Sequence, residues 1–209
     1  MAVSYGYDPA RDTWSRDATE RLLSPIFRAD FSATKLVYQW QTEMDLGYGV
    51  DGLMSTPGRN YSLAIRVRGR QFRRFQDVTF RYESLQTMNK RLEFEKTIAT
   101  HMAYAYADTD FPTPARELIE WQFIKVQVLV EMWRDKAIEW DTRPTDNHDG
   151  SSRLIAFKFS TLARHGLIVA GFVSPNVSAL FTPHKKPMVS ERQVLPAPLK
   201  PATVRMPGF

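Results

Sequence analysis

The residues best suited to chemistry are arginines that gather in one short stretch of the chain. Residues 52–76 contain six arginines and no carboxylate. A guanidinium is permanently charged and presents a planar fork of N–H donors that matches two phosphate oxygens. Segregated positive charge of this kind indicates a surface that meets a nucleic-acid backbone, although the outer face of a strand also carries solvated arginines. The six are Arg59, Arg66, Arg68, Arg70, Arg73 and Arg74.

Two acidic residues, Asp51 and Glu20, are of a type that could take part in a different chemistry. Carboxylates that converge on Mg²⁺ activate water for the hydrolysis of a phosphodiester. Asp51 lies just before the arginine-rich stretch, and Glu20 lies in the first predicted helix. Each also has a plainer interpretation. An aspartate beside glycines commonly caps a turn, and a glutamate on a helix commonly faces solvent.

The elements that position these residues follow from the periodicity of apolar side chains. Over residues 61–68 apolar and polar side chains alternate, so Arg66 and Arg68 share one face of a strand. Pro57-Gly58-Arg59-Asn60 predicts a turn before this strand. Residues 78–82 alternate in the same way and predict its hairpin partner. The other patterns predict helices over 14–29, 89–107 and 130–140, strands over 37–41, 121–129, 154–159 and 167–172, a short helical turn after 113, and a polar loop over 141–152. The spacing of apolar side chains thus changes several times between two residues, typical of strands, and about 3.6 residues, typical of helices. This change indicates an α/β fold with a central mixed β-sheet flanked by helices.

The composition predicts one domain followed by a tail. A chain of 209 residues with 43% hydrophobic residues can build one core, which we expect over residues 1–174. Seven of the 13 prolines lie beyond residue 173. They predict an extended basic segment over residues 175–209 that could lie over a protein partner.

Several kinds of protein are disfavoured by the composition. The chain has no cysteine, and its four histidines are too widely spaced for a histidine metal site. It has no nucleotide-binding glycine motif and no apolar run of about 20 residues, so we expect no membrane span. The amino-terminal residues do not look like a secretory signal. A cytoplasmic location is the expectation, with a formal net charge of +5 that favours anionic partners.

The order of these features resembles the PD-(D/E)XK nuclease superfamily. The matching parts are a first helix with Glu20, the segment Tyr48-Gly49-Val50-Asp51-Gly52, and Arg66-Val67-Arg68 on the next strand. Residues 63–68 followed by 77–81 also look like a group of small phage-encoded proteins. The resemblance covers about residues 15–172 and implies a restriction-endonuclease-like fold. It also implies a Mg²⁺-dependent phosphodiesterase site with Asp51 and Glu20 as acids and Arg68 in place of the family's lysine.

One departure from the family pattern affects the expected activity. Arg66 falls where the family has its second acid, and arginine cannot ligate Mg²⁺. Glu43 or Asp45 would have to replace that ligand. We therefore expect a DNA-binding protein, of phage or mobile-element origin and acting in the cytoplasm of the host cell, that is a weak or inactive nuclease. The alternative is a non-enzymatic assembly subunit that uses the same scaffold and its carboxy-terminal tail to hold a protein.

Overall fold

A long central strand organises the molecule, which we describe from a computed structural model for residues 9–84, 93–146 and 152–173. This strand, β3 (Arg59–Arg68), contains the alternating segment predicted over 61–68. Its partner β2 (Gly52–Thr56) is joined to it by Pro57 and Gly58, and Gly58 has a φ of 81° that suits glycine in a tight turn. The predicted turn chemistry is confirmed.

The main sheet has six strands in the order β1-β2-β3-β5-β6-β9. The pair β3 and β5 is parallel, and all other neighbours in this sheet are antiparallel. The predicted mixed central sheet is therefore confirmed. Its remaining strands are β1 (Lys35–Tyr38), β5 (His101–Ala107), β6 (Leu118–Ile124) and β9 (Ile168–Val173).

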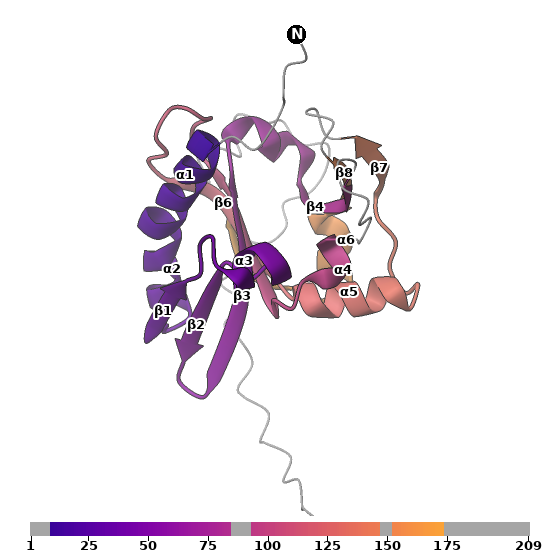
Figure 1. Cartoon of the computed structure of the whole chain (residues 1–209), viewed down its shortest axis with the longest axis horizontal. Helices are drawn as coiled ribbons and strands as arrows, with labels where there is room; N and C mark the ends of the chain where they lie inside the picture. The colour runs from indigo at the N-terminus through magenta and orange to yellow at the C-terminus, as the bar shows by residue number, and fades with distance from the viewer. Residues whose placement is uncertain (1–8, 85–92, 147–151, 174–209) are drawn as a thin grey trace, which may run out of the picture.

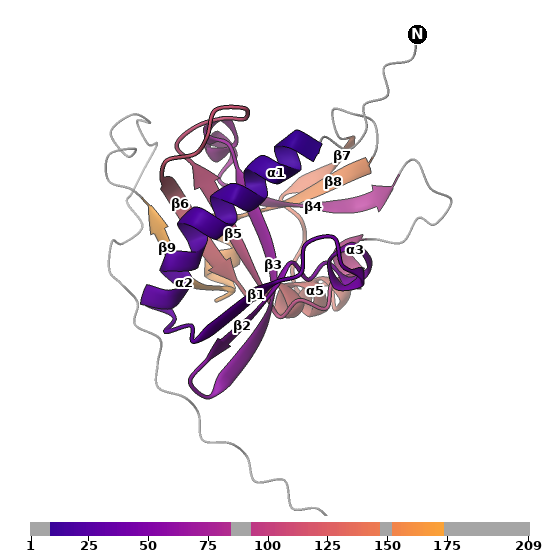
Figure 2. The same ribbon diagram turned by 60° about the vertical axis from the view of Figure 1, so that its left-hand side comes forward.

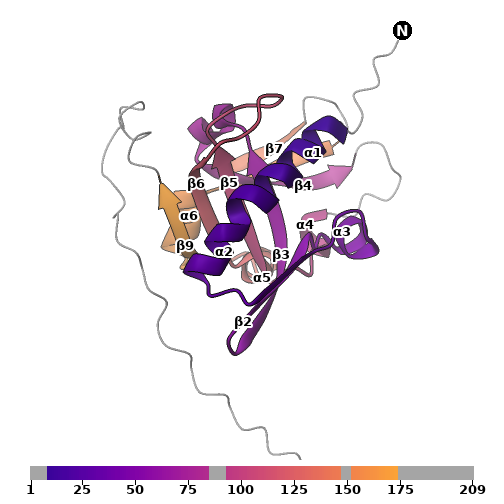
Figure 3. The same cartoon turned by 90° about the vertical axis from the view of Figure 1, so that its left-hand side faces the viewer.

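The amino-terminal helical segment covers one face of this sheet. It consists of α1 (Pro9–Ala18), one π-helical turn η1 (Thr19–Leu23) and α2 (Ser24–Asp30), and it crosses the strands diagonally (Figures 2 and 3). The strand β5 turns three alanines toward this layer, Ala103, Ala105 and Ala107, and all three are buried in the core beneath the helices. Small side chains let a helix approach a sheet closely, and the helix predicted over 14–29 is confirmed.

A second layer covers the opposite face, as Figure 1 shows. It contains a three-stranded antiparallel sheet in the order β4-β8-β7, whose inner side chains share a core with the main sheet. The elements of this layer are β4 (Asp77–Ser84), β7 (Thr142–Asp146), β8 (Ser152–Lys158), α4 (Glu93–Lys96), α5 (Val126–Arg134) and α6 (Phe159–Arg164). Two further short helices are α3 (Glu43–Tyr48), before β2, and the 3₁₀-helix η2 (Arg70–Phe75), between β3 and β4.

Several predicted elements are wrong for identifiable reasons. The strand β4 does not form a hairpin with β3, because β2 and β5 already occupy both edges of β3. The helix predicted over 89–107 is the short α4 followed by β5, a strand that is buried on both faces. The strand predicted over 121–129 ends at Ile124, and the valines after it belong to α5.

Two further predicted elements differ from the structure. Part of the polar loop predicted over 141–152 is the strand β7, and no helical turn follows residue 113. The tail expected over 175–209 lies outside the described residues. Within the described ranges, no helix is both long enough and apolar enough to cross a bilayer.

Candidate nucleic-acid interface

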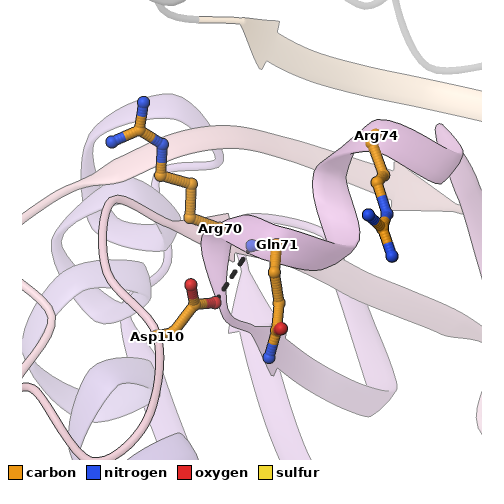
Figure 4. A pocket seen from close by; sticks show the side chains of 4 residues that line it. All are labelled: Arg70, Gln71, Arg74 and Asp110. Carbon is orange, nitrogen blue, oxygen red and sulfur yellow. Dashed lines mark hydrogen bonds between the residues drawn. The ribbon is translucent and has the colours of Figure 1, made fainter.

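The helix η2 presents two exposed arginines, Arg70 and Arg74, beside a shallow pocket of about 250 Å³ (Figure 4). Gln71 and Asp110 complete the lining. The loop after β5 fixes this helix, because Asp110 Oδ1 accepts a hydrogen bond of 3.0 Å from the backbone N–H of Gln71. Gly69, just before the helix, lies so close to Asp110 that a side chain would not fit. The two guanidinium groups therefore project from a well-held backbone.

Stacking on aromatic rings orients two of the cations. The guanidinium carbon of Arg68 lies 4.7 Å from the centre of the Phe72 ring, and that of Arg74 lies 4.8 Å from the centre of the Phe75 ring. Within the part of the chain that the structure describes, neither these two arginines nor Arg70 forms an ion pair with a carboxylate. We call Arg68, Arg70 and Arg74 the cationic surface.

Arg73 has a different environment from its neighbours on η2. Its side chain is buried, with 8% of the residue exposed, and its Nε lies 2.9 Å from Glu120 Oε2. Glu120 is itself 1% exposed and also accepts a hydrogen bond of 3.0 Å from Gln76 Nε2. Removal of either partner would leave the other charge buried without compensation, which is strongly destabilising. The geometry gives Arg73 a structural role rather than a place on the surface.

Arg66 also makes contacts inside the protein. Its Nη1 donates a hydrogen bond of 2.7 Å to the backbone oxygen of Thr79, which lies on the outer edge of β4. Tyr106 Oη donates in the same way to the backbone oxygen of Asp77 at 2.8 Å. Burial, together with the nearby charge of Arg68, lowers the pKa of Arg66 to about 10, so the group stays positive at neutral pH. Arg66 thus links the two sheets behind the cationic surface.

Arg59 is exposed but remote from the other arginines. It begins β3, whereas Arg68 ends it, and ten residues of strand place the two about 30 Å apart. Its guanidinium carbon lies 5.8 Å from the centre of the Tyr61 ring. The structure therefore does not bring all six predicted arginines together.

Asp51 lies immediately before β2 begins and extends its ladder with β3 by one residue. Its Oδ2 accepts a hydrogen bond of 2.5 Å from the backbone N–H of Ile65, and its own N–H donates to the backbone oxygen of Leu63 at 2.8 Å. Burial raises the pKa of Asp51 to about 7. The Ile65 N–H and the Arg66 charge oppose this rise, whereas Asp45 adds to it. The capping interpretation of Asp51 accounts for these contacts.

The acids do not fit a nuclease metal site. Asp45 is the neighbour of Asp51, but its Oδ2 already accepts the backbone N–H of Gln41 at 2.8 Å. Glu20 accepts a hydrogen bond of 2.8 Å from Trp40 Nε1. Among the described residues, no group of three or more acidic, histidine or cysteine side chains lies close enough to hold a metal. Two carboxylates next to the cation Arg66 do not supply the converging negative charge that catalytic Mg²⁺ requires.

Comparison with known proteins adds no family to this description. Protein-family models, curated proteins and solved structures gave no match to the chain.

Sequence reasoning missed two residues beside the cationic surface. Lys158 Nζ donates a hydrogen bond of 2.5 Å to the backbone oxygen of Phe75 and lies 3.7 Å from Asp77 Oδ2. Lys158 is 83 residues from Phe75 in the sequence, and no local pattern joins them. Phe75 ends η2, and its place beside Arg73 and Arg74 in the sequence is the local signal that could have indicated it.

Proposed function

We propose that this protein binds nucleic acid through the cationic surface formed by Arg68, Arg70 and Arg74. One observation carries the proposal. These three arginines lie within seven residues of chain, on a backbone held by the loop after β5, and none of them forms an ion pair with a carboxylate of the described residues. Their neighbour Arg73, by contrast, is paired with the buried acid Glu120. Guanidinium groups that are not paired with a carboxylate are suited to phosphate oxygens.

The nearby acids weaken this surface little. Asp77 is buried and its Oδ2 lies 3.7 Å from Lys158 Nζ, so the lysine offsets the charge of this carboxylate. Asp110 uses one carboxylate oxygen on the backbone N–H of Gln71. Positive charge therefore dominates on the outward side of η2, which favours a polyanion as the partner.

A PD-(D/E)XK-like core of phage or mobile-element origin is part of the proposal. The order of a long helical segment, the strands β1, β2 and β3, and a parallel strand β5 supports this relationship. The site favours binding over cleavage, because Asp51 caps the backbone of β3 and Arg66 contacts β4. The alternative of an assembly subunit depends on residues 175–209, which lie outside the described part of the chain.

A binding assay with a charge-matched control tests the proposal. The variant R68Q/R70Q/R74Q lowers the formal net charge from +5 to +2. We expect it to bind a fluorescein-labelled 20-nucleotide DNA at least about tenfold more weakly than the wild type in 0.1 M salt, because each lost phosphate contact also loses counterion release.

The control variant R28Q/R143Q/R164Q makes the same change in charge at exposed arginines on α2, β7 and α6. It should bind within about twofold of the wild type, since overall charge alone has a weak effect at this salt concentration. Equal losses in the two variants would contradict the proposal, because they would show that net charge rather than this surface attracts DNA.

A further inference from the structure

Phe75 is the exposed aromatic side chain of the arginine-rich region. With 42% of the residue exposed, it differs from Phe80, which is buried, and from Phe72 and Tyr82, which pack against the core. A single exposed apolar side chain is ordinary on a protein surface. The contacts around Phe75 are what make it unusual.

The backbone on both sides of Phe75 is firmly anchored. Before it, Arg73 is held by the buried ion pair with Glu120. After it, Gln76 donates through Nε2 to that same Glu120, and the backbone oxygen of Gln76 accepts a hydrogen bond of 3.0 Å from the N–H of Phe159. An exposed ring on a fixed backbone loses little conformational entropy when a flat ligand stacks on it.

Two cations lie beside Phe75. The Arg74 guanidinium stacks on its ring, with its carbon 4.8 Å from the ring centre, and Lys158 Nζ donates to the backbone oxygen of Phe75. Arg70 lies at the start of η2 and lines the pocket that Arg74 also lines. An aromatic ring beside phosphate-binding cations is an arrangement that binds unpaired bases, because every base offers a flat face for stacking.

From this geometry we infer that the cationic surface recognises single-stranded nucleic acid, with a base stacked on Phe75 and the adjoining phosphates on Arg70 and Arg74. The inference rests on the proposed function, because it names the substrate class of the same surface. A duplex keeps its bases stacked inside, so it would offer Phe75 no base face.

Three DNA probes separate base stacking from phosphate binding. They are a mixed-sequence 20-nucleotide single strand, its duplex, and a single strand of equal length in which the central ten sites are abasic. The abasic strand keeps its phosphates but lacks the bases. Wild-type protein should bind the intact single strand at least about fivefold more tightly than either other probe, the lower end of the range for one stacked base.

The variant Phe75→Leu should lose this preference. Its affinity for the intact single strand should fall at least about fivefold, whereas its affinity for the abasic strand and the dependence of binding on salt should not change. Phe75→Trp keeps an aromatic face and should retain the preference. The control is Phe172→Leu, which truncates another exposed ring, on β9, and should bind all three probes like the wild type.

The outcomes distinguish the inference from the function on which it rests. If Phe75→Leu binds the intact single strand as tightly as the wild type, or if the wild type prefers the duplex, the stacking inference is overturned while phosphate binding by the arginines stands. If the Phe75 ring binds a protein partner instead, Phe75→Leu should bind the intact single strand as tightly as the wild type. If the wild type binds none of the probes, the proposed function fails as well.

Discussion

Replacing Asp51 with asparagine changes stability in a direction that the structure specifies. In the folded protein the pKa of Asp51 rises from 3.8 to about 7, chiefly because of burial. Between these two values the folded state binds more protons than the unfolded state, so the free energy of unfolding falls as the pH rises from about 4 to 7. Each pKa unit corresponds to about 1.4 kcal/mol, so a rise of about three units makes the penalty about 4 kcal/mol above pH 7.

Asparagine at position 51 removes the cost of burying a charge and keeps the hydrogen bond from the backbone N–H of Ile65. Its side-chain oxygen can accept the Ile65 N–H, and its amide group can donate to the carboxylate of Asp45. We therefore expect Asp51→Asn to be about 4 kcal/mol more stable than the wild type at pH 8 and nearly equal to it at pH 4.

Urea unfolding at pH 4, 6 and 8 measures this difference, with circular dichroism as the signal. The control is Asp17→Asn, which removes one carboxylate from an exposed pair with Arg21 and should change stability by no more than about 0.5 kcal/mol at any of these pH values. If Asp51→Asn were less stable than the wild type at pH 8, the charged form of Asp51 would be the stabilising one, and the reasoning would be refuted.

The remaining predictions concern a histidine, a buried ion pair and metal dependence. Burial lowers the pKa of His101 to about 4, so the wild type should lose up to about 3 kcal/mol of unfolding free energy as the pH falls from 6.5 to 4, and His101→Phe should not show this loss in urea unfolding. Arg73→Met leaves Glu120 buried without its partner and should cost about 3–5 kcal/mol, whereas the neighbouring exposed Arg74→Met should cost less than about 1 kcal/mol, measured in the same assay. Plasmid DNA incubated with the wild type should remain uncut to the same extent in Mg²⁺ and in EDTA. Strong Mg²⁺-dependent cutting that Asp51→Asn abolishes would show that the carboxylate pair holds a metal.

Local patterns predicted the elements that depend on local interactions. The alternation over 61–68 gave β3, and Pro57-Gly58 gave the turn before it. The amino-terminal helical segment also followed from its apolar spacing, although the π-helical turn within it did not.

The strand β5 shows why other elements could not be predicted. It is a central strand buried on both faces, with alanines toward the helices and Met102, Tyr104 and Tyr106 toward the second layer. When both faces are apolar the period of two disappears from the sequence, and three alanines then favour a helical interpretation. The position of β4 could not be predicted from the sequence either, because β4 pairs with β8, which lies about 70 residues later in the chain.

The same limit applies to the candidate site. Arg73 and Arg74 are adjacent in the sequence and chemically identical, yet one is buried and the other exposed. The difference arises from Glu120, a residue of β6 that no short-range pattern connects to η2. Composition therefore located the arginine-rich segment, and only tertiary contacts separated the structural arginines from those available to a ligand.

The dependence of binding on salt tests the cationic surface most directly. The logarithm of the binding constant for a single-stranded DNA should fall linearly with the logarithm of salt concentration, and each phosphate contact contributes about 0.7 to the slope. Removal of three contacts in R68Q/R70Q/R74Q should therefore reduce the slope by about 2, while R28Q/R143Q/R164Q should keep the wild-type slope. If the first variant folded normally and showed the wild-type slope, Arg68, Arg70 and Arg74 would not be the residues that bind the phosphates.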